Sequence, residues 1–129
     1  MNKHEASFQT IFGRYLKARK RKIHGHFELK QTRTDSIPFS CVKEHQENGL
    51  YAAQRESFFW KHSDQDERQK PFDCSYVPPL TTYVVIKYAL SRKFYIITYT
   101  WFLKEKEESK RKSLTEERAK KICAFEVQL

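Results

Sequence analysis

Four chemically active side chains alternate with mostly apolar residues near the N-terminus. The even positions of segment 23–31 are His24, His26, Glu28 and Lys30. Because successive side chains of a β-strand point to opposite faces, a strand here would place these four groups on one face. A carboxylate suits hard cations such as Mg²⁺ or Mn²⁺, and a nearby amine can stabilise developing negative charge. Glu28 and Lys30, two residues apart on such a strand, could therefore meet one metal ion and one bound water, which is the arrangement that metal-assisted phosphodiester hydrolysis uses, although a lone Glu-x-Lys pair is a weak signal.

The two histidines of this segment admit two interpretations. Their spacing, with one residue between them, fits metal ligands. The Glu-x-Lys chemistry, however, prefers oxygen ligands, which favours a role for His24 and His26 in contacting phosphate or lining the site.

Two helices are predicted around this strand. Apolar residues recur at helical spacing over residues 3–17, and Glu5 lies at the edge of the apolar face. A loop over residues 32–38 leads into a second helix over about 40–54, for which Ser40 is the predicted N-cap. Gln46 falls in this second helix, where it could orient a water or contact DNA, although a plain polar helix edge is an equal alternative.

The remainder of the chain predicts several strands and one final helix. Short strands are expected at 58–60 and 72–77, with a polar loop at 63–70, and stronger strand signals cover 83–88 and 94–103. Ser91-Arg92-Lys93 is short enough for a hairpin turn. Ser113-Leu114-Thr115-Glu116 fits a capping box that begins a helix through about Ile122. We expect the strand aromatics to be mostly core, with base stacking as the alternative for Tyr83, Tyr88, Tyr95, Tyr99 and Trp101.

The charge balance suggests a polyanionic partner. The 129 residues include 25 Lys and Arg against 16 Asp and Glu, a net charge of +9. Nucleic acid is the first candidate and an acidic membrane surface the second, while a basic surface without a partner is the remaining alternative. Candidate phosphate contacts, as opposed to solvated turns, are Arg14, Lys17, Arg19, Lys20, Arg21, Lys22, Lys110, Arg111 and Lys112.

Length and cysteine usage set the expected class of protein. A chain of 129 residues suits one domain over residues 1–129, which we expect to include a charged C-terminal helix at about 104–123. Three widely separated cysteines with no C-x-x-C pair argue against a disulfide framework and a structural zinc site. The cysteines favour reduced thiols in a cytosolic protein, and the sequence has neither an apolar stretch of membrane-spanning length nor the apolar run of a secretory signal at the start.

One region resembles a known nuclease family. Phe27-Glu28-Leu29-Lys30, followed by Pro38-Phe39-Ser40 and by Val42-Lys43 and His45-Gln46, is similar to a segment of RecU-like and related phage Holliday-junction resolvases of the PD-(D/E)xK superfamily. The resemblance implies an α/β (α+β) fold with a restriction-endonuclease-like core, a central mixed β-sheet flanked by helices. It also implies a Mg²⁺-dependent (or Mn²⁺-dependent) endonuclease acting as a homodimer on branched double-stranded DNA. The location that it implies is the cytoplasm of a bacterium or of a phage-infected host cell.

The resemblance further implies roles for particular residues. Glu28 and Asp73 would bind the metal with the Leu29 backbone carbonyl, Lys30 would assist the attacking water, and Glu5 and Gln46 would be auxiliary. The usual upstream Asp of the family is missing, and Pro71-Phe72-Asp73 resembles that element moved downstream. We expect a neighbouring antiparallel strand to bring Asp73 beside Glu28, with Asp35, Asp64 and Asp66 as weaker candidates. DNA contacts would come from the basic segments together with His24, His26 and Lys43.

Two other functions remain open from the sequence. One is a non-catalytic nucleic-acid-binding protein of the same fold that uses only its basic segments. The other is a nuclease of the same fold that acts on a different DNA substrate, such as nicked, flapped or linear DNA.

Overall fold

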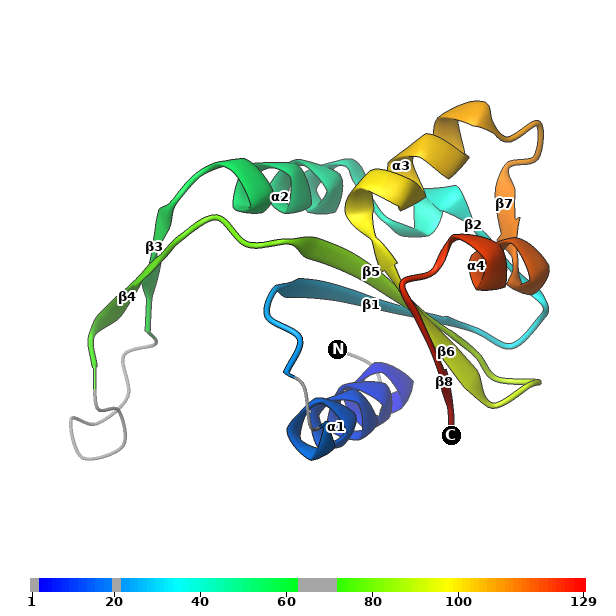
Figure 1. Cartoon of the computed structure of the whole chain (residues 1–129), viewed down its shortest axis with the longest axis horizontal. Coiled ribbons are helices and arrows are strands. Elements are labelled where there is room, and N and C mark those ends of the chain that lie inside the picture. The colour runs from blue at the N-terminus through cyan, green and yellow to red at the C-terminus, as the bar shows by residue number, and fades with distance from the viewer. Residues whose placement is uncertain (1–2, 20–21, 63–71) are drawn as a thin grey trace.

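A four-stranded mixed sheet forms the centre of the molecule (Figure 1). The computed structural model describes residues 3–19, 22–62 and 72–129, with side chains described from Ser7 onward. The sheet order is β1 (His26–Thr32), β5 (Thr82–Tyr88), β6 (Lys93–Thr98) and β8 (Phe125–Gln128). β1 runs parallel to β5, whereas the β5–β6 and β6–β8 pairs are antiparallel. The expected mixed α+β fold with a central mixed sheet flanked by helices is therefore confirmed, while the restriction-endonuclease-like core stays a prediction.

Helices cover both faces of this sheet and divide the core in two. On one face α1 (Lys3–Ala18) packs Phe8 and Phe12 against Val85, Phe94 and Ile96. The other face carries α2 (Glu44–Arg55), α3 (Tyr99–Glu108) and α4 (Glu116–Ile122), as Figure 1 shows. Odd positions of β1 contribute to the α1 side, so Glu28 and Lys30 belong to the α2 side. The predicted helix over 3–17 is confirmed, and the predicted alternation holds from His26 onward. The strand begins at His26 rather than at residue 23, so the prediction that His24 shares its face is wrong.

The second helix begins later than expected. Residues 39–41 form a short 3₁₀ helix, η1 (Phe39–Cys41), because Phe39 and Val42 turn inward and are 4% and 2% exposed. The N-cap of α2 is Lys43, whose backbone N–H donates to the Gln46 side-chain oxygen at 3.0 Å. The prediction of Ser40 as the N-cap is therefore wrong.

The second half of the 94–103 segment is helical rather than extended. β6 ends at Thr98, whose hydroxyl accepts a hydrogen bond from the Trp101 backbone N–H at 3.3 Å and so caps α3. Tyr99 and Phe102 lie three residues apart, on one face of that helix, and both are buried. Tyr88, Tyr95 and Tyr99 are core residues as expected, whereas Trp101 is 49% exposed.

The expected charged helix over about 104–123 is replaced by three elements, and β8 follows them. The last turns of α3 are followed by β7 (Ser113–Thr115), then α4, then β8 at the sheet edge. Thr115, not Ser113, caps α4 by accepting from the Arg118 backbone N–H. β7 pairs with β2 (Ser36–Pro38), which explains why Leu114 is buried at 1% exposure. The Ser91-Arg92-Lys93 turn is confirmed, with Arg92 at φ 58°.

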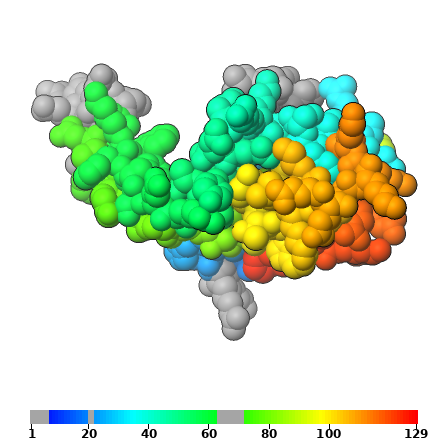
Figure 2. Space-filling model, turned by 90° about the horizontal axis from the view of Figure 1, so that it is seen from above, coloured from blue at the N-terminus to red at the C-terminus, as the bar shows by residue number. Residues whose placement is uncertain are grey.

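A two-stranded arm projects beyond the sheet. β3 (Phe58–Lys61) and β4 (Cys74–Val77) pair antiparallel with each other and belong to a sheet of their own. Figure 1 shows the arm running away from the end of α2, and Figure 2, seen from above, shows it (green) extending past the body. Its base is tied to α2, because the Leu80 backbone N–H donates to the Ala53 carbonyl at 3.2 Å. The predicted loop 63–70 lies outside the described residues.

In the part of the chain that the structure describes, no helix is both long and apolar enough to cross a membrane.

Candidate active site

Glu28 and Lys30 meet on the α2 side of β1. The Lys30 Nζ lies 3.3 Å from the Glu28 Oε1, and the two side chains are 15% and 29% exposed respectively. Side chains two positions apart on an extended strand point to the same face, so this contact follows directly from the Glu-x-Lys spacing. The predicted pairing of an acid and an amine on one face of this strand is therefore present.

Gln46 fixes the orientation of the Glu28 carboxylate. Its side-chain nitrogen donates to the Glu28 Oε1 at 3.2 Å, and its oxygen accepts from the Lys43 backbone N–H at 3.0 Å. Both ends of the amide are therefore engaged, which leaves it little freedom to rotate. The position of Gln46 at the third residue of α2 couples the start of this helix to the site.

An open cleft of about 480 Å³ adjoins the pair. One wall is α1, with Gln9 and Gly13, and the other is residues 27–31 of β1 together with Gln46. Sequence reasoning missed Gln9 and Gln31, although Gln9 follows the candidate Glu5 by one helical turn and that spacing was a usable signal. Glu5 lies in α1, but its side chain falls outside the described residues.

The free edge of β1 presents a backbone oxygen to this cleft. The His26 N–H donates to Thr81 and the Thr32 carbonyl accepts from Ala89, so even-numbered peptide groups of β1 face β5. Since peptide groups alternate along a strand, the Leu29 carbonyl faces the opposite, open edge. Among the described residues no strand pairs with that edge. The predicted role of the Leu29 carbonyl is compatible with this direction.

A second hollow of about 590 Å³ lies on the other side of Glu28. It is bounded by α2, by the start of β1 and by the base of the arm, with Leu50, Ala53 and Trp60 in its walls. His26 also lines it, and the His26 ring lies 5.8 Å from the ring of Phe58. The His26 Nε2 is buried without a hydrogen-bond partner in the described structure. His24, by contrast, is exposed ahead of the strand.

The structure does not bring Asp73 beside Glu28 within one chain. Asp73 directly precedes β4, and its carbonyl accepts from the His62 N–H in the arm. β4 pairs with β3 and not with β1, so the expected antiparallel neighbour of the Glu28 strand is wrong. Asp35 lies in the turn before β2, where its carbonyl accepts from Glu116. Asp64 and Asp66 lie outside the described residues.

The predicted basic residues divide into exposed and engaged groups. Exposed side chains are those of Arg14, Lys17, Lys43, Lys110, Arg111 and Lys112. Arg19 instead donates to the Tyr15 hydroxyl at 2.6 Å and lies 4.5 Å from the Phe125 ring centre. Lys22 donates to the carbonyls of Leu16 and Lys17 at the end of α1. Lys20 and Arg21 lie outside the described residues.

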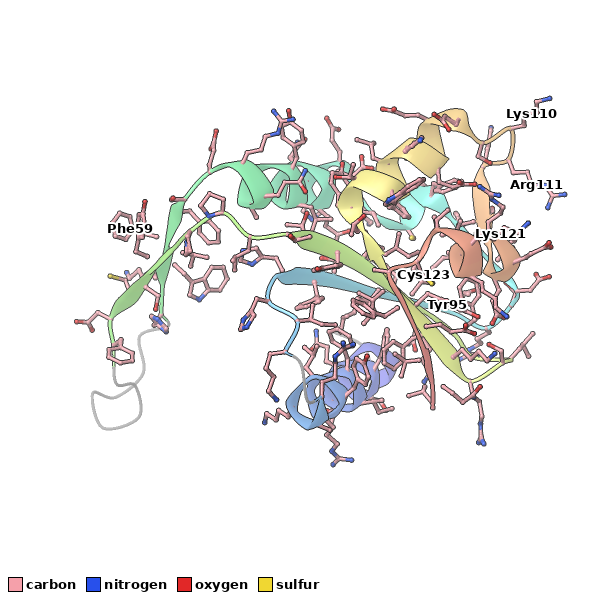
Figure 3. The ribbon with its side chains drawn as sticks, in the orientation of Figure 1. Phe59, Tyr95, Lys110, Arg111, Lys121 and Cys123 are labelled. Carbon is pink, nitrogen blue, oxygen red and sulfur yellow. The ribbon has the colours of Figure 1, made fainter. Side chains whose placement is uncertain are left out.

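The two ends of the molecule have different chemistry. Figure 3 shows Lys110 and Arg111 extending outward at the end of the molecule opposite Phe59, which lies on the arm. Phe59 is 73% exposed, so the arm end is aromatic while the opposite end is basic.

A thiol next to the site is kept protonated. Burial raises the pKa of Cys41 to about 11, and the nearby Lys30 ammonium only partly offsets that effect. A nucleophile requires the thiolate, so Cys41 is chemically quiet at neutral pH. In the residues that the structure describes, no three His, Cys, Asp or Glu side chains gather as a metal-binding group.

Comparison with known proteins gave no match to a family model, a curated protein or a solved structure.

Proposed function

We propose that this protein is a metal-dependent endonuclease that cuts branched DNA, with Glu28 and Lys30 at its active site. The observation that carries the proposal is the 3.3 Å contact between the two side chains at the open edge of β1. An acid and an amine that meet beside a solvent-open cleft are groups that metal-assisted phosphodiester hydrolysis can use.

The oxygen donors at this edge fit Mg²⁺ or Mn²⁺. The Glu28 carboxylate and the Leu29 carbonyl are hard ligands, and Mg²⁺ commonly uses one or two carboxylates while it keeps several waters. Such a cation would polarise the phosphate and lower the pKa of a bound water.

The chain's own groups have separate roles in this proposal. Lys30 places a positive charge where negative charge develops on the phosphate, an effect worth about 10²–10³ in rate for one well-placed donor. Gln46 is a positioning residue, since it holds the Glu28 oxygen through its side-chain nitrogen. Glu5 and the exposed cations Arg14, Lys17 and Lys43 are proposed to contact or surround the substrate.

DNA as the substrate is supported by the net charge of +9. The preference for four-way junctions and the homodimer come from the resemblance of segment 27–46 to resolvases. Two symmetric nicks across a junction need two active sites, and a two-fold assembly supplies them.

The test is cleavage of synthetic four-way junctions with and without Mg²⁺. Wild type should nick the junction only when the metal is present, and the Glu28→Ala, Lys30→Ala double variant should be at least about 100-fold slower. Equal rates for wild type and the double variant would refute the assignment. Nicked, flapped and linear duplexes in the same panel would distinguish junction resolution from a different DNA specificity.

A second candidate function is a non-catalytic nucleic-acid-binding protein of the same fold. It is favoured by one observation: Glu28 contacts the Lys30 amine and the Gln46 amide, and in the described part of the chain no group of acids that could hold a metal gathers around it. This alternative predicts binding that weakens with salt, does not respond to Mg²⁺ and shows no turnover.

A further inference from the structure

A third hollow, of about 640 Å³, lies between the end of α2 and the start of α3. Figure 2 shows these two segments, green and yellow, side by side on one face of the molecule. The hollow shares no lining residue with the cleft and the hollow that adjoin Glu28. It is therefore a part of the molecule that the proposed nuclease chemistry does not use.

Among the described residues, hydrogen-bonding groups and one cation line this hollow, and no acid does. Its polar lining consists of Gln54, Arg55, Thr81, Thr98, Thr100 and Trp101. By contrast, Glu28 lines both the cleft beside α1 and the hollow beside the arm. An anion can therefore enter the third hollow without meeting a carboxylate.

A buried threonine fixes the orientation of the Gln54 amide. The Thr82 hydroxyl donates to the Gln54 side-chain oxygen at 3.1 Å, and Thr82 is 0% exposed. Because that oxygen is engaged, the amide nitrogen is the end that can donate to a ligand in the hollow. Together with the exposed guanidinium of Arg55, it offers donors of the kind that phosphate oxygens accept from.

Two cations lie over exposed aromatic rings at this hollow. The Lys104 ammonium is 4.7 Å from the ring centre of Trp101, and the Arg55 guanidinium is 4.3 Å from that of Tyr51. Trp101 and Tyr51 are nevertheless 49% and 44% exposed, so each ring still has surface available to a ligand. Aromatic rings interleaved with cations bind single-stranded nucleic acid, because bases stack on the rings and phosphates contact the cations.

The charge of the surrounding surface favours nucleic acid over protein as the occupant. Residues 50–55 at the end of α2 and residues 98–104 at the start of α3 include two cations and no acid. A polyanion gains from such a surface wherever it lies, whereas a protein partner would need a matching acidic patch. The exposed rings further select an unpaired strand, since its bases have faces free to stack.

We propose that this α2–α3 surface, made of Tyr51, Gln54, Arg55, Trp101 and Lys104, binds an unpaired DNA strand. Bases stack on the two aromatic rings, and the two cations with the Gln54 amide contact the phosphates. Binding here needs neither a metal nor cleavage. The inference therefore goes beyond the proposed function and does not depend on it.

The first test is fluorescence anisotropy with a labelled oligo(dT) strand of about 12 nucleotides, in the presence of EDTA. Trp101→Ala should bind this strand at least about fivefold more weakly than wild type, because one stacking ring is lost. Its affinity for a duplex of the same length should stay within about twofold of wild type, since paired bases do not use the ring. Phe59→Ala, which removes an exposed ring on the arm, is the matched control and should bind the strand as wild type does.

Unchanged oligo(dT) affinity in Trp101→Ala would overturn the proposal, and so would an equal loss of affinity for the duplex. Tighter binding of an oligo(rU) strand of the same length would overturn DNA as the occupant. None of these results bears on cleavage at Glu28, because EDTA removes the metal.

The dependence of binding on salt tests the cation. Arg55→Gln should lower the slope of log affinity against log salt concentration by about 0.7, the value for one phosphate contact on a single strand. Lys121→Gln on α4 removes the same charge outside the α2–α3 surface and should leave the slope unchanged. Equal reductions in both variants would show only a general effect of net charge and would contradict a local phosphate contact.

Tryptophan emission gives a direct signature of stacking. The chain has two tryptophans, Trp60 and Trp101, so Trp60→Phe leaves Trp101 as the only one. Emission of this variant should be quenched as oligo(dT) binds, because a base stacks on the indole, whereas Trp101→Phe should show no quenching. Quenching confined to the variant that retains Trp60 would place the strand on the arm and overturn the proposal.

Discussion

The neighbouring parallel strands β1 and β5 share a register but differ in their environment. Val84, Val85 and Ile86 of β5 are fully buried, whereas all seven residues of β1 are half-buried. In register, Glu28 lies opposite Val84 and Lys30 lies opposite Ile86. β5 has a strand on each side and helices over both faces, so its positions require apolar residues. Among the described residues β1 has a neighbouring strand on one side only, and at its other edge a charged pair can stay partly exposed.

Under the proposed function, stability and chemistry would belong to different strands of one sheet. If so, substitutions at paired positions of β1 and β5 should have opposite consequences for folding and for activity.

The largest contrast is expected between Ile86→Ala and Lys30→Ala. Ile86→Ala should lower the free energy of unfolding by about 2–5 kcal/mol, because it leaves a cavity in a fully buried strand. Lys30→Ala should lower it by no more than about 1 kcal/mol, because this ion pair is partly exposed. Urea denaturation of both variants measures the difference.

The variant that loses more stability should lose less activity, so the ranking of the two variants should be reversed in the cleavage assay. At a temperature where both are folded, Lys30→Ala should be about 10²-fold slower on four-way junctions and Ile86→Ala close to wild type. If both variants lost stability equally, the division between an active edge strand and a structural inner strand would be wrong.

A smaller effect is expected where β5 meets the far end of the fold. The Tyr88 hydroxyl donates to the Leu114 carbonyl at 3.0 Å in a fully buried environment. Tyr88→Phe should therefore cost about 1–2 kcal/mol, which thermal or urea unfolding would resolve. Tyr83→Phe is the matched control in the same strand, since its half-buried ring stacks on Phe27 and should cost less than about 0.5 kcal/mol. Equal losses of unfolding free energy in the two variants would mean that the hydrogen bond of the Tyr88 hydroxyl adds no stability beyond that of the half-buried Tyr83 hydroxyl.

The smallest expected effect concerns the ion pair that joins α3 to α4. Arg118 donates two hydrogen bonds to the Glu105 carboxylate, at 2.9 and 2.8 Å, and this holds the pKa of Glu105 below its usual value. A lowered carboxyl pKa contributes stability that is present above about pH 4.5 and is lost as pH falls through the folded-state value. Arg118→Ala should therefore cost about 0.5–1 kcal/mol near pH 7, and the difference from wild type should shrink below pH 4.5. A difference that grew in acid would contradict this assignment.

Strong periodic patterns predicted much of the fold. The helix over 3–17, the Glu28–Lys30 strand and the strand over 83–88 follow from alternation or helical spacing, and burial in the structure obeys the same patterns. The side-by-side placement of Glu28 and Lys30 followed from period two alone.

Other features depended on contacts that local patterns do not encode. The end of β6 at Thr98 is decided by a capping hydrogen bond and by burial of Phe102, although residues 94–103 have uniformly high strand propensity. β4 pairs with β3, whereas the segment around Asp73 was expected from the sequence to pair with β1. Local sequence patterns do not determine which strands pair, because pairing depends on the tertiary fold. β8 was not predicted, because its short sequence has no strong strand pattern and it becomes a strand by pairing with the edge of β6.

The most direct test of the central claim is Mn²⁺ binding measured by electron paramagnetic resonance, because it needs no assumption about the DNA substrate. Wild type should bind Mn²⁺, and Glu28→Gln should bind it at least about tenfold more weakly while unfolding at a similar urea concentration. Glu47→Gln is the matched control, since Glu47 lies in α2 and pairs with Lys106 at 2.9 Å rather than with the site. Unchanged Mn²⁺ binding in Glu28→Gln, or an equal loss in Glu47→Gln, would contradict a divalent-cation site at the edge of β1.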